Sequence, residues 1–137
     1  MKQFIQTFTS QEFEKVIQLG DRFFMLNNKL ESVKSKNNIQ PEYIGAYLGF
    51  MHNGKFVPSF LLLNILSKLT ERTTIINKKQ EWLFTNKKDL NTKGKTEIKE
   101  GAVIVLNSRK QVLGLGEIKG SRLKNLADVG DFMRRER

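Results

Sequence analysis

A run of five apolar residues, Ala102-Val103-Ile104-Val105-Leu106, constrains the fold of this chain more than any other feature. An uninterrupted apolar run of this length is typical of a β-strand that is buried on both faces. The polar turn Asn107-Ser108-Arg109-Lys110 links it to a second predicted strand, Gln111–Ile118, which carries Gly114 and Gly116. Alternating glycines suit a bulge or a tight bend where a sheet closes on itself. The second half of the chain is therefore predicted to form a small β-barrel, to which three short β-prone segments also contribute: Thr73–Ile76, Trp82–Phe84 and Thr96–Ile98.

The first half has a different texture, with helical and strand patterns mixed. Thr9-Ser10-Gln11-Glu12 has the spacing of a capping box, and apolar residues follow at helical spacing, so a helix is predicted over residues 10–20 with Gly20 as its end. Phe23–Leu26 is predicted to be a buried strand. A turn at Asn27-Asn28 leads into Lys29–Val33, and Ser35–Gln40 is predicted to be a loop.

An Asn-Gly pair gives the clearest local prediction. Asn53-Gly54 lies between two apolar segments, and Asn-Gly favours a two-residue hairpin turn because both turn positions need a positive φ. A hairpin of residues 43–51 with 55–58 is expected, followed by a helix from Pro58-Ser59 to about Leu69. The predicted fold class is α+β: a small N-terminal α/β module over residues 1–72, followed by a β-barrel over residues 73–137.

Net charge is the strongest global indication of function. The 137 residues hold 24 Lys and Arg against 14 Asp and Glu, a net charge of +10. Residues 73–137 hold 15 basic and 8 acidic side chains, so most of the excess lies in the second half. An excess of this size attracts polyanions, and a nucleic acid is the expected partner ahead of an acidic membrane or protein surface.

Several classes of protein are disfavoured by what the sequence contains. It has no cysteine, which excludes disulfides and thiol chemistry and is compatible with a reducing cytoplasm. The apolar runs Ala102–Leu106 and Phe60-Leu61-Leu62-Leu63 both fall far short of a membrane span, so a soluble cytoplasmic protein is expected.

No motif in the sequence supports catalysis or a cofactor. Gly94-Lys95-Thr96 resembles the end of a phosphate-binding loop, but Asp89 occupies the position of the required first glycine. Gly114, Gly116 and Gly120 miss the spacing of a dinucleotide fingerprint. We therefore expect no enzyme activity, no cofactor, no metal site and no small-molecule substrate.

The remaining candidate residues have structural explanations. His52, the one histidine, adjoins a predicted turn, where exposure is the ordinary reason for a histidine. Asp128 and Asp131 flank Gly130 and are expected to organise the chain near its end. Trp82, the one tryptophan, is expected in a core or an interface rather than as a base-stacking platform.

Clusters of cations are the best candidates for a binding site. Long basic side chains in turns reach a phosphate backbone without reading bases. The strongest cluster places three cations within six residues after a predicted strand, and two pairs occupy predicted turns. The predicted RNA-binding residues are Lys119, Arg122, Lys124, Arg109, Lys110, Lys87 and Lys88.

Several of these segments resemble a known family. Leu113-Gly114-Leu115-Gly116, a basic segment and then Asp128–Arg134 resemble the end of a PUA domain, and Trp82–Lys87 is similar to a segment inside that domain's pseudobarrel. Leu48–Phe56 and the helix to Leu69 resemble the hairpin and helix of a pre-PUA module. Together these segments resemble the Nip-seven family of ribosome-biogenesis factors over most of residues 40–137, in an archaeal-type short form.

The resemblance implies a function and a site. In that family the PUA domain binds RNA, with basic residues in the segment that corresponds to Lys119, Arg122 and Lys124, and no catalytic residues are carried over. It implies a non-catalytic role in rRNA processing or large-subunit assembly, with rRNA or pre-rRNA and proteins of pre-ribosomal particles as partners. Two alternatives stay open: an accessory module for an RNA methyltransferase or pseudouridine synthase, and an adaptor that binds an acidic protein.

Overall fold

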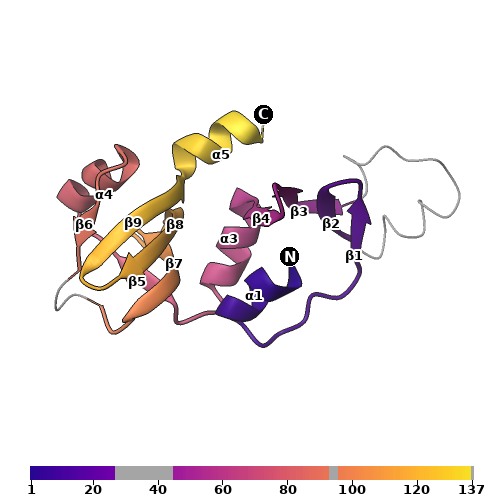
Figure 1. Cartoon of the computed structure of the whole chain (residues 1–137), viewed down its shortest axis with the longest axis horizontal. Coiled ribbons are helices and arrows are strands. Elements are labelled where there is room, and N and C mark those ends of the chain that lie inside the picture. Colours follow the sequence, from indigo (N-terminus) through magenta and orange to yellow (C-terminus); the bar gives the residue numbers. More distant parts are fainter. Residues whose placement is uncertain (27–44, 93–95, 137) are drawn as a thin grey trace, which may run out of the picture. The chain divides into compact units, whose positions relative to one another are not determined.

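The computed structural model describes residues 1–26, 45–92 and 96–136, which form two compact units, Met1–Leu62 and Leu63–Arg137 (Figure 1). The division falls ten residues before the boundary predicted from sequence, inside helix α3 (Phe60–Ser67). The predicted segments Lys29–Val33 and Ser35–Gln40, and the glycine and lysine of Gly94-Lys95-Thr96, lie outside the described residues.

The first unit is built on an antiparallel four-stranded sheet. After helix α1 (Lys2–Phe8), its strands follow in the order β1-β2-β3-β4. The bounds are Val16–Leu19, Arg22–Leu26, Gly45–His52 and Lys55–Pro58. The predicted hairpin is confirmed: β3 pairs with β4 across Asn53-Gly54, whose φ angles are 50° and 74°.

The helix predicted over residues 10–20 is wrong. The Oγ1 of Thr9 accepts a hydrogen bond from the backbone N–H of Gln11 at 3.1 Å, which makes a local turn instead of a helix cap. Val16–Leu19 pairs with β2, and Gly20, with a φ of 61°, lies in the turn between the two strands. Pairing of the sheet outweighs the local helical pattern here. The helix lies earlier, at α1, where Ile5 and Phe8 are buried.

Helix α3 begins as the sequence predicts. The Oγ of Ser59 accepts from the backbone N–H of Leu62 at 3.0 Å and donates to the carbonyl of Tyr47 at 2.7 Å. One hydroxyl therefore caps α3 and ties its start to β3. The helix ends at Ser67 and buries Leu62, Leu63 and Leu66, whereas Leu69 lies beyond it and is partly exposed.

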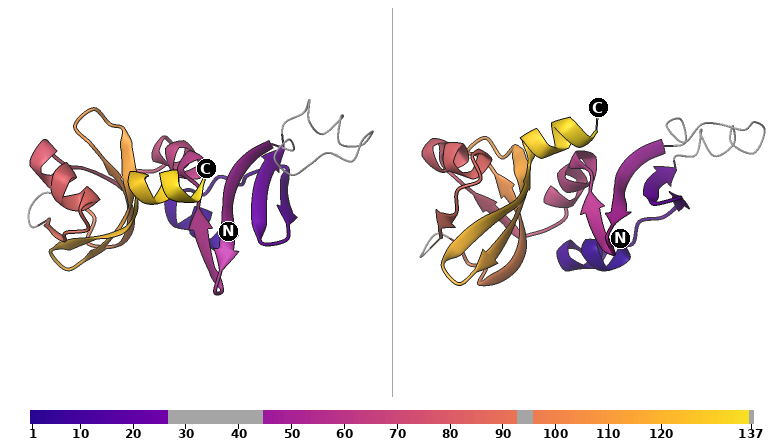
Figure 2. Two further views of the ribbon diagram at one scale, coloured as in Figure 1. Left: turned by 90° about the horizontal axis from the view of Figure 1, so that it is seen from above. Right: turned by 45° about the horizontal axis from the view of Figure 1, so that its top comes forward.

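The second unit is a curled, half-barrel sheet with helices beside it (Figure 2). Strand order is β5-β7-β8-β9-β6, with β5 parallel to β7 and the other neighbours antiparallel. An α+β fold with a barrel-like second unit is thus confirmed. The elements are β5 (Thr73–Ile75), α4 (Lys78–Thr85), β6 (Leu90–Asn91), β7 (Glu100–Leu106), β8 (Val112–Lys119), β9 (Arg122–Asp128) and α5 (Val129–Arg135).

The core of this unit explains the alternating glycines. Val103 and Val105 of β7 point into the core and lie directly across from Gly116 and Gly114 of β8. A Cβ on Gly114 would overlap the carbonyl oxygen of Ala127, so β9 can approach β8 only where no side chain intervenes. The registers shift next to these glycines in both pairings, as expected of bulges. The core cluster comprises Ile76, Phe84, Leu90, Val103, Val105, Leu113, Ile118 and Leu123.

Three predictions for this unit need correction. Trp82–Phe84 belongs to helix α4, which starts at a reciprocal capping box between Asn77 and Gln80, and is not a strand. Residues 96–98 form no strand. The basic segment after β8 continues as strand β9, because Gly120-Ser121 makes a two-residue hairpin and Leu123 fills the core. No helix in the ranges that the structure describes is long and apolar enough to cross a membrane.

Candidate nucleic-acid interface

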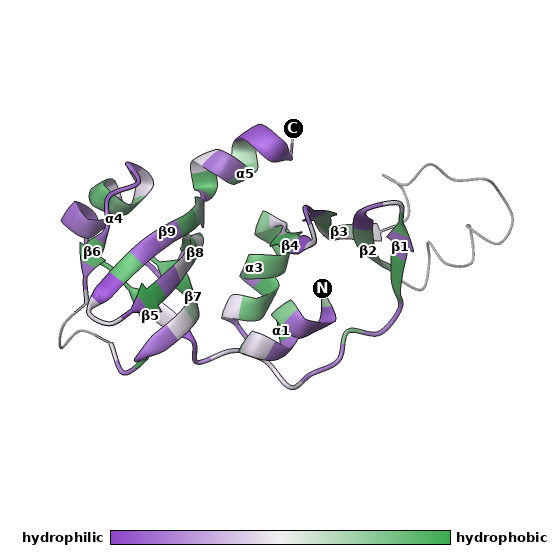
Figure 3. Ribbon diagram, viewed as in Figure 1, coloured by the Kyte–Doolittle hydropathy of each residue, from purple (hydrophilic) through white to green (hydrophobic). Residues whose placement is uncertain are grey.

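The β8–β9 hairpin brings three predicted site residues together. Lys119 and Arg122 lie directly across from each other at its tip, and Lys124 lies two residues further along β9. Because side chains alternate along a strand, Arg122 and Lys124 are exposed on the outer face while Leu123 points into the core. The same alternation is visible along β9 in Figure 3. We call Lys119, Arg122 and Lys124 the hairpin cluster.

Two carboxylates lie across from members of the hairpin cluster and reduce the local net charge from +3 to +1. Glu100 lies across from Lys119, and Glu117 lies across from Lys124. No member of the cluster forms an ion pair with any residue in the described ranges. The three cations are therefore free to contact a ligand.

Arg122 also lines a polar groove. Its other lining residues are Asp89, Leu90, Asn91 and Ser121, and its volume is about 420 Å³. Strand β6 forms this side of the sheet by pairing Asn91 with Arg122. The groove is edged by a guanidinium, an amide, a hydroxyl and the carboxylate of Asp89, so it offers both hydrogen-bond donors and acceptors beside the hairpin cluster.

Arg109 and Lys110 lie at the other end of β8. They occupy the turn between β7 and β8, where the Oδ1 of Asn107 accepts from the N–H groups of Arg109 and Gln111 at 2.9 and 3.0 Å. Strand β8 has eight residues, so it separates this pair from Lys119 by about 25 Å at roughly 3.3 Å per residue. The structure therefore does not bring the turn pair Arg109-Lys110 into the hairpin cluster.

Lys87 and Lys88 follow the C-cap of helix α4 and close its C-terminal end. The N–H of Lys88 bonds to the carbonyl of Leu83, and the N–H of Lys87 bonds to that of Phe84. This is a Schellman motif, and Lys87 takes the left-handed position with a φ of 61°. Its ammonium is held by two carboxylates, Asp128 at 2.8 Å and Asp131. Lys87 is thus ion-paired while about half of its side chain stays exposed, and Lys88 is exposed as well.

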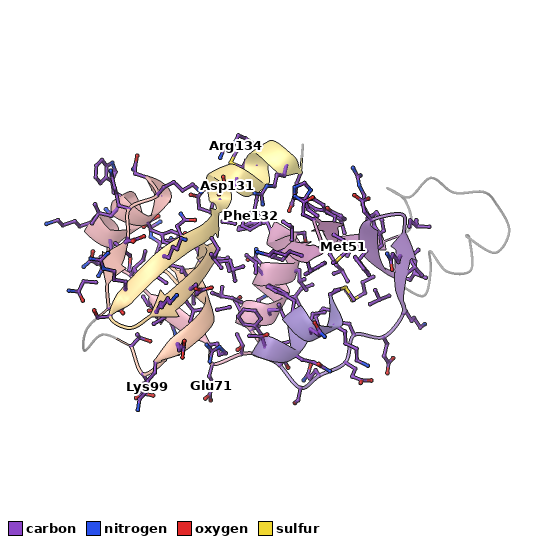
Figure 4. The ribbon with its side chains drawn as sticks, in the orientation of Figure 1. Met51, Glu71, Lys99, Asp131, Phe132 and Arg134 are labelled. Atoms are coloured by element: carbon purple, nitrogen blue, oxygen red, sulfur yellow. The ribbon has the colours of Figure 1, made fainter. Side chains whose placement is uncertain are left out.

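The two aspartates do organise the start of helix α5, as predicted. Asp128 is its N-cap: its Oδ1 accepts from the N–H of Asp131, and Asp131 accepts from the N–H of Asp128. Asn125 donates to Asp128 at 3.0 Å and to the carbonyl of Phe84 at 2.6 Å, which connects α4, β9 and α5. Figure 4 shows Phe132 and Arg134 on opposite sides of α5; Phe132 is buried, and Arg134 bonds to Asp131 at 2.5 Å. We call Lys87, Asn125, Asp128, Asp131 and Arg134 the α5 cap network.

Contacts within the α5 cap network shift the pKa values of Asp128, Asp131 and Lys87. Burial alone would raise the pKa of Asp128, but hydrogen bonds from Lys87, Asn125 and the Asp131 backbone outweigh it and lower the pKa. The pKa of Asp131 is lowered in the same way, against burial, chiefly by Lys87 and the Asp128 backbone. The pKa of Lys87 is raised, because its bonds to the two aspartates outweigh burial. The network therefore favours its fully ionised form.

The remaining candidates are placed as follows. His52 is exposed at the end of β3, with its ring beside Phe50 and its Nε2 3.3 Å from the side-chain amide of Asn53. No group of acidic or histidine side chains within the described ranges is arranged to hold a metal ion. Trp82 is not in the core: it is 64% exposed on helix α4.

Strand β9 is the main feature that sequence reasoning missed. It positions both Arg122 and Lys124, and it supplies Asn125 to the α5 cap network. The alternation of Arg122, Leu123 and Lys124 is the signal that identifies it, because polar and apolar residues alternate on a half-buried strand.

No protein-family model matches this chain, and no curated protein sequence matches it significantly. The function is therefore argued from the charge and geometry described above.

Proposed function

We propose that this chain binds RNA without catalysing a reaction on it, through the outer face of the β8–β9 hairpin. The observation that carries the proposal is the hairpin cluster: three exposed cations on one rigid hairpin, in a chain of net charge +10. The sheet fixes the backbone positions of the three cations, so little backbone ordering opposes binding, and the cost that remains is the ordering of their side chains.

Phosphate is the group that the hairpin cluster suits best. Lysine and arginine side chains neutralise phosphates and release counterions, which gives affinity for any sequence and a strong dependence on salt. The groove beside Arg122 adds amide and hydroxyl groups that can contact sugar hydroxyls. We infer that the protein recognises the shape and backbone of an RNA more than its bases.

A role in rRNA processing or large-subunit assembly is part of the proposal and rests on the resemblance to the Nip-seven family. The α+β fold with a curled second sheet is compatible with that resemblance. Proteins of pre-ribosomal particles would then be further partners, and the protein would work in the cytoplasm.

The experiment compares two variants with equal losses of charge. Replacing Lys119, Arg122 and Lys124 with alanine should weaken RNA binding and flatten the plot of log K against log salt by about two to three units. The matched control replaces Lys2, Arg22 and Lys55 with alanine, three exposed cations of the first unit. Binding is measured by anisotropy of a labelled structured RNA at several salt concentrations.

Each outcome decides between the proposal and a rival. If the control variant loses as much affinity as the cluster variant, binding is diffuse and the site is wrong. If both variants bind RNA as tightly as the wild type, and the affinity of the wild type does not depend on salt concentration, the electrostatic explanation fails. An adaptor for an acidic protein then becomes the better explanation. Stimulation of an RNA methyltransferase by the wild type, lost in the cluster variant, would favour the accessory-module alternative.

A further inference from the structure

The exposed face of helix α4 carries a large aromatic side chain between cations. Trp82 is 64% exposed, and its indole makes no hydrogen bond or ring contact with another residue in the described ranges. Lys78 and Lys79 lie four and three residues before it, and Asn86 lies four after it. Residues at these spacings are neighbours on one side of a helix. All four are exposed, whereas Phe84 on the opposite side fills the core.

We propose that Trp82 is a stacking platform for an unpaired nucleotide of the bound RNA, with Lys78 and Lys79 contacting the adjoining phosphates. The proposal rests on the proposed RNA binding and deepens it, because it names the kind of RNA: one that presents a single-stranded base. An indole stacks on any base, and flanking cations hold the backbone beside it, as on surfaces that bind single strands.

The charges on this face decide against a protein as its occupant. The buried centres of protein interfaces are depleted of lysine, because burying an ammonium is costly. An indole flanked by two lysines instead matches a ligand that combines a flat apolar ring with a phosphate. Helix α4 also contacts β6 and β9, the strands that carry Arg122 and its groove, so both surfaces belong to one unit.

The capped helix fixes the backbone from which the indole projects. The capping box of Asn77 and Gln80 fixes the first turn of α4, and the Schellman motif at Lys87 and Lys88 fixes the last. Between them, the carbonyl of Trp82 accepts from the side-chain amide of Asn86 at 2.7 Å. A helix that is capped at both ends needs little backbone ordering when a base arrives, and only the two side-chain torsions of Trp82 have to be fixed.

The test uses the full chain and its own fluorescence. Trp82 is the only tryptophan, so emission excited where tyrosine does not absorb reports on this site alone. The probes are an oligouridylate and a blunt RNA duplex with the same number of phosphates. We expect the oligouridylate to quench Trp82 and the duplex to leave its emission nearly unchanged. In anisotropy with labelled oligouridylate, Trp82→Ala should bind between about 5-fold and about 150-fold more weakly, and Trp82→Phe should retain most of the affinity.

The control is Met133→Ala, which removes a side chain that is 61% exposed on α5 and should change the Kd by less than twofold. Circular dichroism establishes that each variant is folded. One result would refute the stacking platform and leave RNA binding standing. In it, the wild type binds oligouridylate in a salt-dependent manner without quenching of Trp82, and Trp82→Ala binds equally well. If the wild type binds neither probe at low salt, the proposed function itself fails.

Discussion

Asp128 is the residue whose side chain joins helix α5 to strand β9 and to the end of helix α4. It is 3% exposed, caps helix α5, and is bonded to Lys87 and Asn125. Removing its carboxylate leaves a helix end uncapped and the partly buried amide of Asn125 with one partner fewer. Asp128 therefore connects the end of α4 to the start of α5 through the side chain of one residue.

Asp128→Ala should lower the free energy of unfolding by about 2 to 3 kcal/mol, since it removes a helix cap and a partly buried ion pair together. Asp128→Asn keeps a good cap and should cost about 1 kcal/mol. Urea unfolding at pH 7 measures both. The comparison is Asp89→Ala, an exposed carboxylate that should change stability by less than about 0.5 kcal/mol. Equal losses in all three variants would contradict the capping role.

Acid should weaken the same contacts. Both aspartates have a lowered pKa in the folded chain, so near pH 4, where unfolded aspartates titrate, the unfolded state binds more protons. The contribution of the two ionised aspartates to the free energy of unfolding is complete above the pH range in which unfolded aspartates titrate. It is lost as the pH falls through the pKa values of the folded chain. The stability difference between wild type and the Asp128→Asn, Asp131→Asn double variant should therefore be constant from pH 6 to 8 and shrink below pH 4. Urea midpoints across pH 3 to 8 test this, and a difference that grew in acid would contradict it.

At the scale of the element, the close approach of β8 and β9 depends on a missing side chain. Gly114→Ala places a Cβ against the backbone of Ala127 and Asp128, which cannot move without separating the two strands. We expect a loss of about 3 kcal/mol or more. Gly20→Ala is the control: its Cβ meets nothing, and only its φ of 61° opposes alanine, at a cost of about 1 kcal/mol. Denaturant unfolding measures the loss of stability in both variants. Similar losses would show that β9 moves away easily from a Cβ at position 114.

Elements with a specific local signal were predictable from sequence. Asn53-Gly54 favours a hairpin through its backbone conformation, and the Ala102–Leu106 run, which is short and rich in β-branched residues, favours a buried strand. The error over residues 10–20 arose where pairing in a sheet outweighed a local pattern, and the error at Trp82–Phe84 arose where two local signals compete. Trp82–Phe84 is β-prone, but Asn77 and Gln80 are spaced as a capping box, and that signal accounts for the helix.

At the scale of the whole molecule, the sequence shows that residues 73–137 carry most of the positive charge, but not which of these cations share a surface. Fifteen basic side chains in residues 73–137 are evident from composition. Which of them share a surface depends on the register of β8 with β9, because a shift of one residue would turn Arg122 and Lys124 inward. The engagement of Lys87 by Asp128 and Asp131 depends on a contact across more than forty residues, which no local pattern contains.

The separation of two basic clusters along β8 leads to a prediction about RNA length. The hairpin cluster and the turn pair Arg109-Lys110 lie at opposite ends of the strand. A short oligonucleotide can occupy one end only, so its affinity should fall when the hairpin cluster is replaced with alanine and stay unchanged when Arg109 and Lys110 are replaced. A longer RNA that spans β8 should lose affinity with either change, and the two losses in binding free energy should add, since sites this far apart rarely couple.

Anisotropy with a trinucleotide and with a long structured RNA measures these affinities for the wild type, both cluster variants and their combination. If the turn pair matters equally for the trinucleotide and the long RNA, charge acts over the whole surface and the RNA has no fixed path. If the turn pair matters for neither, the RNA contacts only the hairpin end of the sheet. If the turn pair matters only for the longer RNA, and its loss adds to that of the hairpin cluster, the RNA backbone lies along β8. It would then run from the groove at Arg122 toward the turn at Arg109.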